Sequence, residues 1–317
     1  MILVIGGLNG FVGSNTTEAL VKQGLDCVAT RHKDTEVPRF LQKHIDDHRV
    51  FIESADATRI EDLRRIGETH RIDGIVNVGG GFRALEAKGP IPGLKGYFDT
   101  LDATFRVAEE WKVKRLIFSS TGGVYFGLPG PVNEDLPIPL PSPFPIIANQ
   151  KIVEVAVSEF AKGSGISSVC VRLGAMFGPW WDPAQRFLPS TLVHAAVNGQ
   201  PANLDGVFGG SADEAFDLCY IKDVARAIAL LQTAEKLQYD VYNIGSGKLT
   251  PNREVAEVIK KVIPSFKVDL PPGRSPFPSL PVMETKRLRA DTGFSPAFDT
   301  RSAIQNYVEW LKAGNPK

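Results

Sequence analysis

The chain has 317 residues, of which 43% are hydrophobic and 23% are charged, as in ordinary globular proteins. Lysine plus arginine and aspartate plus glutamate both number 36, so no net charge attracts the chain to nucleic acid or to an anionic membrane. No apolar window reaches the ~20 residues of a membrane span, and no secretion signal is recognisable at the start. Three well-separated cysteines in apolar runs indicate free thiols in a reducing cytoplasm.

The first half of the chain alternates short apolar runs with helical patterns. We predict a helix over residues 12–24 and strands over residues 2–6, 26–31, 50–54, 74–80, 114–121 and 167–173. Strands separated by helices indicate a parallel sheet, and their continuous apolar character indicates helices on both faces. We therefore predict a Rossmann-type, doubly wound α/β dinucleotide-binding domain over residues 1–175.

Beyond residue 175 proline and glycine become denser and the elements less regular. The patterns predict a strand and turn at residues 241–247 and helices over residues 188–199, 223–236, 252–263 and 300–313. We expect residues 176–317 to form a smaller α/β substrate-binding lobe, with the chain crossing back to the first domain near residues 215–245.

A glycine-rich turn follows the first predicted strand. Gly7, Gly10 and Gly13 are spaced three apart and lead directly into a helix. Such glycines permit a tight turn and a close approach of backbone to a pyrophosphate, whose charge is favoured at the helix N-terminus. This context of strand, turn, helix and second strand predicts nucleotide binding.

The end of the second strand bears on the choice of cofactor. An acidic residue at this place commonly holds the adenosine ribose of NAD, but Thr30 and Arg31 stand here. The guanidinium of Arg31 could pair with a 2′-phosphate and stack on adenine, so the sequence favours NADP(H) over NAD(H).

Several further motifs appear in a fixed order. They are "FSSTGGVY" (118–125), a lysine at 151, "VRLGAMFGP" (171–179), "LCYIKDVARA" (218–227) and "YNIGSG" (242–247). With the glycine turn, they make the chain resemble the extended short-chain dehydrogenase/reductase family, the NAD(P)-dependent epimerase/dehydratase group. The resemblance spans the whole chain and implies cytoplasmic enzymes that act on small molecules.

The resemblance also implies roles for individual residues. Thr121 matches the hydroxyl that bonds a substrate oxygen, and Lys151 matches the lysine that holds the nicotinamide ribose. The implied cofactor-binding residues are Gly7, Asn9, Gly10, Phe11, Val12, Gly13, Arg31, Asp56, Ala57, Gly79, Gly80 and Lys151. The helices around residues 95–110 and 148–162 are those the family uses to form a homodimer.

One departure from the family pattern concerns the catalytic tyrosine. The signature Tyr-x-x-x-Lys reads Ile147-Ala-Asn-Gln-Lys151 here. An alkyl group cannot transfer a proton, and removal of a general acid or base forfeits roughly 10²–10⁴ in rate. Three readings remain open. Another group supplies the proton; or the substrate carries its own acid or needs no protonation at that oxygen; or the protein binds the dinucleotide as a sensor without turnover. Tyr97, Tyr125, Tyr220, His194 and a water held by Thr121 and Lys151 are the candidate donors.

The motifs that bear on the substrate point to different substrate classes. Gly122 and Gly123 stand where the family's dehydratases carry Asp-Glu, and Phe216 replaces an arginine that binds diphosphate, although Arg274 matches another phosphate-binding arginine. Aromatic residues near the expected cleft favour an apolar substrate or simply pack the lobes together. The candidate substrate residues are Phe82, Arg83, Trp180 and Trp181.

We accordingly predict an NAD(P)(H)-dependent oxidoreductase or epimerase acting on a small, apolar or aromatic carbonyl or hydroxyl compound, with a non-standard proton donor. The alternatives are a dinucleotide-binding sensor, and a nucleotide-sugar epimerase or reductase, or a lyase or isomerase, on the same scaffold. We predict no metal site, because "HIDDH" (44–48), the one suggestive cluster, reads as a solvated loop.

Overall fold

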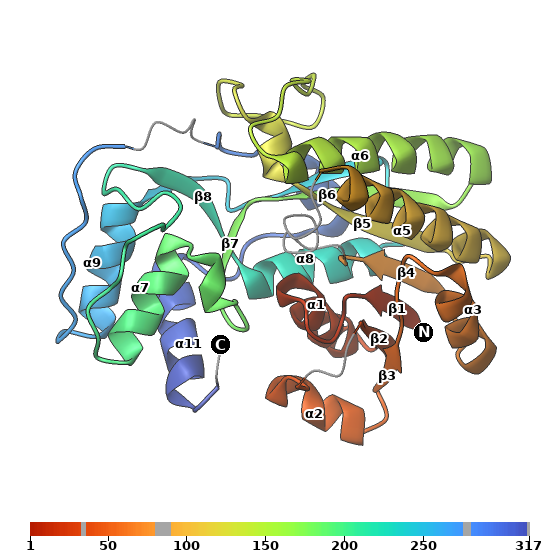
Figure 1. Ribbon diagram of the computed structural model, residues 1–317, viewed down its shortest axis with the longest axis horizontal. Coiled ribbons are helices and arrows are strands. Elements are labelled where there is room, and N and C mark those ends of the chain that lie inside the picture. Colours follow the sequence, from red (N-terminus) through yellow and green to blue (C-terminus); the bar gives the residue numbers. More distant parts are fainter. Residues whose placement is uncertain (33–35, 80–89, 275–279, 316–317) are drawn as a thin grey trace.

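The larger part of the computed structural model, which describes residues 1–32, 36–79, 90–274 and 280–315, is built on a seven-stranded sheet (Figure 1). Its strand order is β3-β2-β1-β4-β5-β6-β9, and every neighbouring pair is parallel. The strands are β1 (Ile2–Ile5), β2 (Cys27–Arg31), β3 (Val50–Ser54), β4 (Gly74–Asn77), β5 (Arg115–Thr121), β6 (Ser167–Leu173) and β9 (Val241–Ile244). The predicted Rossmann-type sheet is confirmed.

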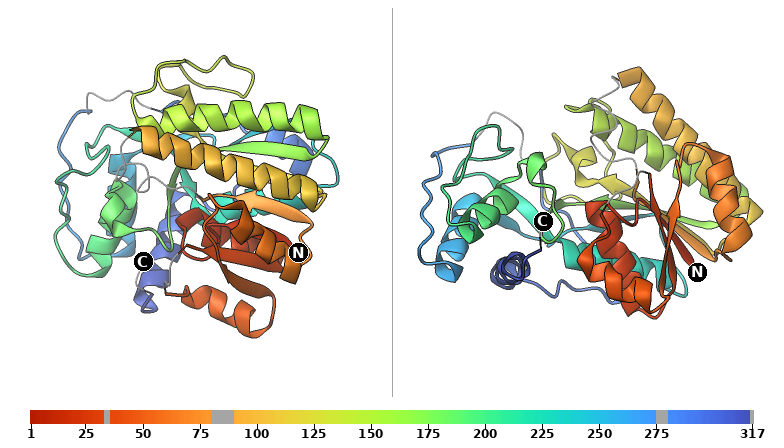
Figure 2. Two further views of the ribbon diagram at one scale, coloured as in Figure 1. Left: turned by 45° about the vertical axis from the view of Figure 1, so that its right-hand side comes forward. Right: turned by 60° about the horizontal axis from the view of Figure 1, so that its bottom comes forward.

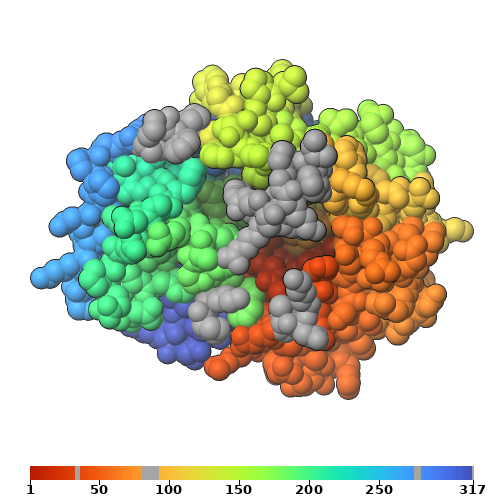
Figure 3. Space-filling view, viewed as in Figure 1, coloured from red at the N-terminus to blue at the C-terminus, as the bar shows by residue number. Residues whose placement is uncertain are grey.

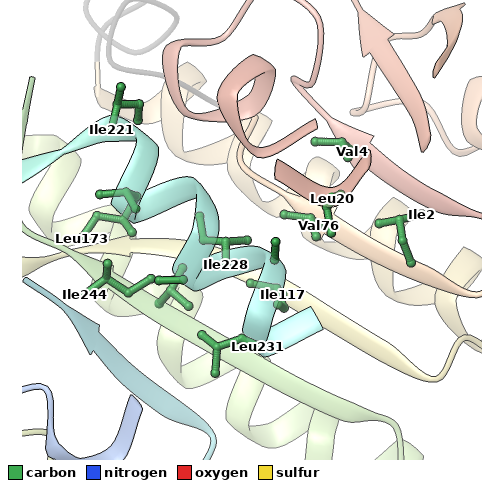
Figure 4. Close-up of a cluster of buried hydrophobic side chains, with 14 of the residues drawn as sticks. Ile2, Val4, Leu20, Val76, Ile117, Leu173, Ile221, Ile228, Leu231 and Ile244 are labelled. Atoms are coloured by element: carbon green, nitrogen blue, oxygen red, sulfur yellow. The ribbon is translucent and has the colours of Figure 1, made fainter. Parts of the chain in front are cut away.

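Helices cover both faces of this sheet. Successive side chains along a strand point to opposite faces, so each strand contributes to two apolar cores. Ile2 and Val4 of β1 belong to one apolar core, shown in Figure 4, whereas Leu3 and Ile5 belong to another. The helices on the first face are α1 (Phe11–Lys22), α2 (Arg39–Asp46), α8 (Ile221–Thr233) and α10 (Lys286–Thr292). Those on the second face are α3 (Ile60–Thr69), α5 (Pro90–Glu110) and α6 (Pro145–Ser164), of which α5 and α6 lie side by side (Figure 2).

The second lobe has its own small sheet, of order β10-β8-β7, at the left of Figure 1. Its strands are β7 (Ala175–Phe177), β8 (Ala215–Tyr220) and β10 (Leu249–Pro251), and its helices are α7 (Leu188–Val197), α9 (Asn252–Val262) and α11 (Thr300–Lys312). The three helices pack together through a third core that includes Leu192, Ile259 and Tyr307. Two short 3-10 helices, η1 (Gly122–Tyr125) and η2 (Pro183–Gln185), follow β5 and precede α7.

The observed elements differ from the predicted ones in a few places. The fourth strand ends at Asn77 rather than residue 80, and α2 contains the first part of "HIDDH", contrary to the predicted loop. The α2 pattern is short, and Leu41 is its only buried side chain, so the apolar signal was weak. The chain enters the small sheet at β7 and β8, returns to the large sheet at β9 and joins the small sheet again at β10, while a boundary at residue 175 stays a prediction. None of the described helices is long and apolar enough to cross a lipid bilayer.

Candidate functional site

The candidate site lies at the carboxyl ends of the parallel strands, which all meet at one edge of the sheet. The strand order reverses between β1 and β4, and crevices at such switch points bind ligands in open α/β sheets. At this point the turn after β1 lies against the chain after β4. The approach is so close that a Cβ on Gly6 would lie 3.0 Å from the Cα of Gly79. Figure 3 shows the N-terminal residues in red between the two lobes.

The glycines of the turn after β1 leave no room for side chains. A Cβ on Gly13 would lie 2.0 Å from the carbonyl oxygen of Gly6, and one on Gly7 would lie 2.7 Å from that of Val4. The hydroxyl of Thr17 donates to the carbonyl oxygens of Gly7 (3.1 Å) and Gly13 (3.0 Å). Helix α1 is thereby held against the end of β1, as a pyrophosphate-binding turn requires.

The N-terminus of α1 offers backbone N–H groups to an anion. Within the described residues no side chain caps the helix at Gly10, so the first turn retains its positive dipole end uncompensated. Asn9 donates its amide to the carbonyl of Glu36 (3.0 Å) and accepts the indole N–H of Trp180 (3.4 Å) at its own carbonyl. Phe11, Val12 and Gly13 form the first turn, where their backbone could meet a phosphate.

The predicted adenosine end lies where β2 and β3 finish. Nε of Arg31 donates to the hydroxyl of Ser54 (3.2 Å), and the buried Thr30 hydroxyl accepts the N–H of Gly6 (2.9 Å). Thr30, which the sequence analysis did not assign, thus braces the glycine turn. Asp56 accepts the backbone N–H and the hydroxyl of Thr58 at one oxygen. Its burial raises the carboxyl pKa, but the Thr58 hydrogen bonds outweigh that effect and keep the pKa below its ordinary value. Ala57 is half-buried beside it.

Thr121 and Ile147 meet at the opposite end of the site. The Thr121 hydroxyl accepts the N–H of Gly123 at 3.1 Å and so caps η1. A Cβ on Gly123 would lie 2.9 Å from Cδ1 of Ile147 and 3.3 Å from the Thr121 oxygen. Ile147 is 4% exposed, so its side chain fills the space that the missing Gly123 side chain leaves. Gly123 and Ile147 are therefore matched to each other, which neither residue reveals alone in the sequence.

Lys151 is occupied by a neighbouring segment. Its ammonium donates to the carbonyl oxygens of Pro139 and Pro141 (3.0 Å) and to the hydroxyl of Ser142 (2.8 Å). Burial lowers the pKa of Lys151, and the charge of Glu154 opposes this. The contact of Lys151 with a nicotinamide ribose stays a prediction, whereas its contact with residues 139–142 is observed.

A buried polar network stands behind the site. Arg172 of β6 binds Glu154 of α6 with Nη2 at 2.7 Å and Nε at 3.0 Å from the two carboxylate oxygens, and Ser120 donates to Glu154 at 2.5 Å. Arg172 also donates to the hydroxyl of Tyr125 (2.5 Å), which donates to Asn243 (2.9 Å). Burial raises the pKa of Tyr125, and its hydroxyl is engaged by Arg172 and Asn243, so this candidate proton donor is part of the buried network.

The two tryptophans pack the second lobe onto the glycine turn. Trp180 and Trp181 are 4% and 9% exposed. Trp181 meets Phe11 edge to face at 5.0 Å, and Phe40 lies between Trp180 and Trp310. These surroundings favour the packing role over the predicted substrate contact, which stays a prediction.

Of the remaining predicted cofactor-binding and substrate residues, the structure describes Gly79 only. Gly79 follows β4 and donates its N–H to the side chain of Asn77 at 3.1 Å. Gly80, Phe82 and Arg83 lie outside the described residues. Over residues 1–32, 36–79, 90–274 and 280–315, no three His, Cys, Asp or Glu side chains gather in a manner that could hold a metal ion.

Comparison with known proteins identifies a family and several proteins of similar fold. The model of the NAD dependent epimerase/dehydratase family matches residues 2–245. The chain is 26% identical to a UDP-glucose 4-epimerase from Lactobacillus helveticus, over 100% of this chain and 98% of the relative. It superposes on a UDP-glucose 4-epimerase from Thermotoga maritima, solved with UDP-glucose, with a TM-score of 0.82 at 20% identity over 99% of both chains.

A dTDP-glucose 4,6-dehydratase from Bacillus anthracis, solved in complex with NAD, is also similar, with a TM-score of 0.80 at 20% identity over 98% of this chain and 96% of the other. At such identities the superpositions show the fold alone. The named relatives handle sugars joined to nucleotides, so they do not support the predicted small apolar substrate and fit the alternative of a nucleotide-sugar enzyme better.

Proposed function

This chain belongs to the NAD-dependent epimerase/dehydratase family, and we propose that it binds a nicotinamide dinucleotide at the carboxyl edge of the large sheet and transfers hydride to or from a nucleotide sugar. The observation that carries the proposal is the turn between β1 and α1, whose glycines admit no Cβ and whose helix begins without a side-chain cap. The relatives named for UDP-glucose and dTDP-glucose, matched over nearly the whole chain, support the substrate class.

The choice of coenzyme rests on Arg31. Relatives solved with NAD favour NAD(H), whereas the arginine at the end of β2 favours the 2′-phosphate of NADP(H). We propose NADP(H). Arg31→Ala is expected to reduce NADP⁺ affinity by about tenfold to hundredfold, since charge-assisted hydrogen bonds contribute roughly 1.5–3 kcal/mol, while leaving NAD⁺ affinity unchanged. Calorimetric titration of both coenzymes measures this, and equal losses for both would contradict it.

Turnover is tested with the coenzyme present. The protein is incubated with UDP-glucose, dTDP-glucose and UDP-glucuronate, and the nicotinamide absorbance and the sugar NMR spectrum are followed. A new sugar nucleotide, or coenzyme reduction, supports the proposal. Absence of binding heat with NAD⁺, NADH, NADP⁺ and NADPH would overturn it at its base.

A dinucleotide sensor without turnover is the second candidate, and one observation favours it specifically. Ile147 is buried against Gly123, and the Lys151 ammonium is held by residues 139–142. The tyrosine and lysine that the resemblance implies for proton transfer are therefore represented by an alkyl group and by an ammonium that already has partners. Tight coenzyme binding with no product from any of the three sugar nucleotides would favour the sensor over the enzyme.

We also propose a homodimer formed through α5 and α6. These neighbouring helices expose Phe98 (48%) and Val155 (66%), large apolar side chains on the face away from the sheet. A sedimentation mass of two chains that falls to one chain in Val155→Lys supports the dimer, and a single-chain mass for the unaltered protein would contradict it. The cysteines Cys27, Cys170 and Cys219 are buried and unbridged, which supports a reducing, cytoplasmic location.

A further inference from the structure

The orientation of α6 about its own axis determines which of its side chains meets the site. Glu154 is fastened to Arg172 of β6 and Ser120 of β5, and both charged groups are more than 90% buried. Residues four apart lie on one face of a helix, so Ile146 and Gln150 continue the stripe of Glu154 toward the carboxyl edge of the sheet. Gln150 is 9% exposed, in keeping with this position.

Lys151 lies on a different stripe. One residue along an α-helix corresponds to a rotation of about 100°, and four residues beyond Lys151 stands Val155, which is 66% exposed. The Lys151 ammonium accordingly reaches sideways to Pro139, Pro141 and Ser142. The tyrosine and the lysine of the family signature are four residues apart. Ile146 and Gln150 have this spacing, as do Ile147 and Lys151. The first pair lies on the helix face of the buried Glu154, so it is the better match in space.

Gln150 has a polar neighbour on α5 and an unused acceptor. Burial raises the pKa of the Tyr97 phenol to about 12, and the side chain of Gln150 opposes this rise, so the two side chains are neighbours. Oε1 of Gln150 is buried and has no hydrogen-bond partner within the described residues. A buried carbonyl oxygen without a partner is costly, and such an atom calls for an unseen donor.

Both side chains stand just beyond the carboxyl ends of two adjacent strands. Asn77, the last residue of β4, donates to Thr104 of α5 at 3.1 Å, and Tyr97 lies about two turns nearer the start of that helix. Glu154 receives Ser120 near the end of β5, and Gln150 lies about one turn nearer the start of α6. Because both helices run back along the strands, these turns extend past Gly79 and Thr121, where the nicotinamide end of the dinucleotide is expected.

We propose that Gln150, supported by Tyr97, is the group of α6 that contacts the nicotinamide ribose, with Oε1 of Gln150 accepting a ribose hydroxyl, and that Lys151 instead holds residues 139–142. This inference rests on the proposed function, because it presumes that a dinucleotide occupies the site. The contact is made by a neutral amide, so this position of α6 supplies no positive charge that would favour an oxyanion at the reacting carbon.

The test uses calorimetry on the full chain with two probes, the reduced coenzyme that the protein binds more tightly (NADH or NADPH) and ADP, which lacks the nicotinamide half. Gln150→Leu is expected to weaken binding of the reduced coenzyme about threefold to tenfold, the loss of one hydrogen bond. Its ADP affinity is expected to stay unchanged. Lys151→Gln is the matched control, with both affinities unchanged and faster amide exchange at Leu140 and Ser142.

Tyr97→Phe keeps the ring and removes the hydroxyl, so it tests the same pair with less risk to folding, and it is expected to weaken the reduced coenzyme about twofold to fivefold. Equal losses of ADP and coenzyme in Gln150→Leu would mean a structural role and overturn the inference. A loss confined to Lys151→Gln, or no loss in any variant, would also overturn it. Failure of the proposed function is recognisable separately, since the unaltered protein would then bind neither probe.

Discussion

The two ends of the candidate site have diverged to different extents from the family pattern. At the phosphate end, the turn after β1 has three glycines that admit no side chain, a helix N-terminus without a side-chain cap, and Thr30 bracing Gly6. At the other end, α6 presents Ile146, Ile147 and Gln150, and its lysine is bound to a neighbouring segment. The difference teaches that the turn is defined by the absence of side chains, whereas the α6 end is defined by which side chains the orientation of the helix presents.

Glu154→Gln is expected to have the largest effect, because it removes the charge that orients α6. An uncompensated Arg172 would remain buried, which costs about 3–5 kcal/mol in the free energy of unfolding. Urea denaturation measures this loss. Glu159→Gln breaks the exposed pair with Lys162 on the same helix and is expected to cost under ~1 kcal/mol. Similar losses in both variants would show that the Glu154–Arg172 pair does not anchor the helix.

Gly13→Ala breaks the phosphate end of the comparison. Its Cβ would lie 2.0 Å from the Gly6 carbonyl oxygen, so α1 must move away from β1 at a cost of about 1–3 kcal/mol, and coenzyme binding is expected to fall with it. Gly163→Ala on α6 is the control, since a Cβ there meets nothing within 4 Å and alanine is the better helix former. Unchanged stability and unchanged coenzyme affinity in Gly13→Ala would contradict the geometry of the turn.

Tyrosine substitutions at neighbouring positions sharpen the comparison at the α6 end. Ile147→Tyr must fit a larger ring into the space above Gly123 and is expected to destabilise the fold by about 1–2 kcal/mol. Ile146 is half-buried, so Ile146→Tyr is expected to be tolerated. Thermal denaturation of the two variants decides between them, and greater damage at 146 than at 147 would contradict the observed packing.

A chemical test follows from the same stripe of α6. The double variant Ile146→Tyr with Gln150→Lys places a phenol and an ammonium four residues apart on the face that carries Glu154. It is expected to gain coenzyme-dependent reduction of a simple carbonyl compound, followed as loss of nicotinamide absorbance. The pairing of Ile147→Tyr with the native Lys151 is the control and is expected to gain less. The reverse order would place Lys151, rather than position 150, at the reacting carbon.

The smallest expected effect is a pH dependence of the protein's stability, and it involves a histidine of the second lobe rather than either end of the candidate site. His194 of α7 contacts the hydroxyl of Tyr307 at 2.8 Å, and burial lowers the histidine pKa below its ordinary value. As pH falls below about 6.5, the unfolded chain takes up a proton that the folded chain resists, so stability decreases toward acid. Urea midpoints at pH 7.5 and 5.5 measure this, and His194→Gln should reduce the difference. An undiminished difference would assign the pH dependence to other groups.

Sequence patterns were sufficient for much of the fold, as particular elements show. The alternation of apolar runs with helical periods predicted the large parallel sheet, because strands covered on both faces are apolar throughout. The glycine spacing predicted the turn after β1. The small sheet was harder, because β7 and β10 are only three residues long and lie far apart in the chain, so pairing with β8 leaves little local signal.

What the sequence by itself determined is the order of strands and helices, the glycine turn, and the absence of a tyrosine around residue 147. What only the tertiary structure decided is which face of α6 turns toward the sheet. A shift of one residue rotates a side chain by about 100°, and linear spacing cannot distinguish Gln150 from Lys151. The face is fixed by the buried pair of Glu154 on α6 with Arg172 on β6, two residues on different elements that folding brings within 2.7 Å of each other.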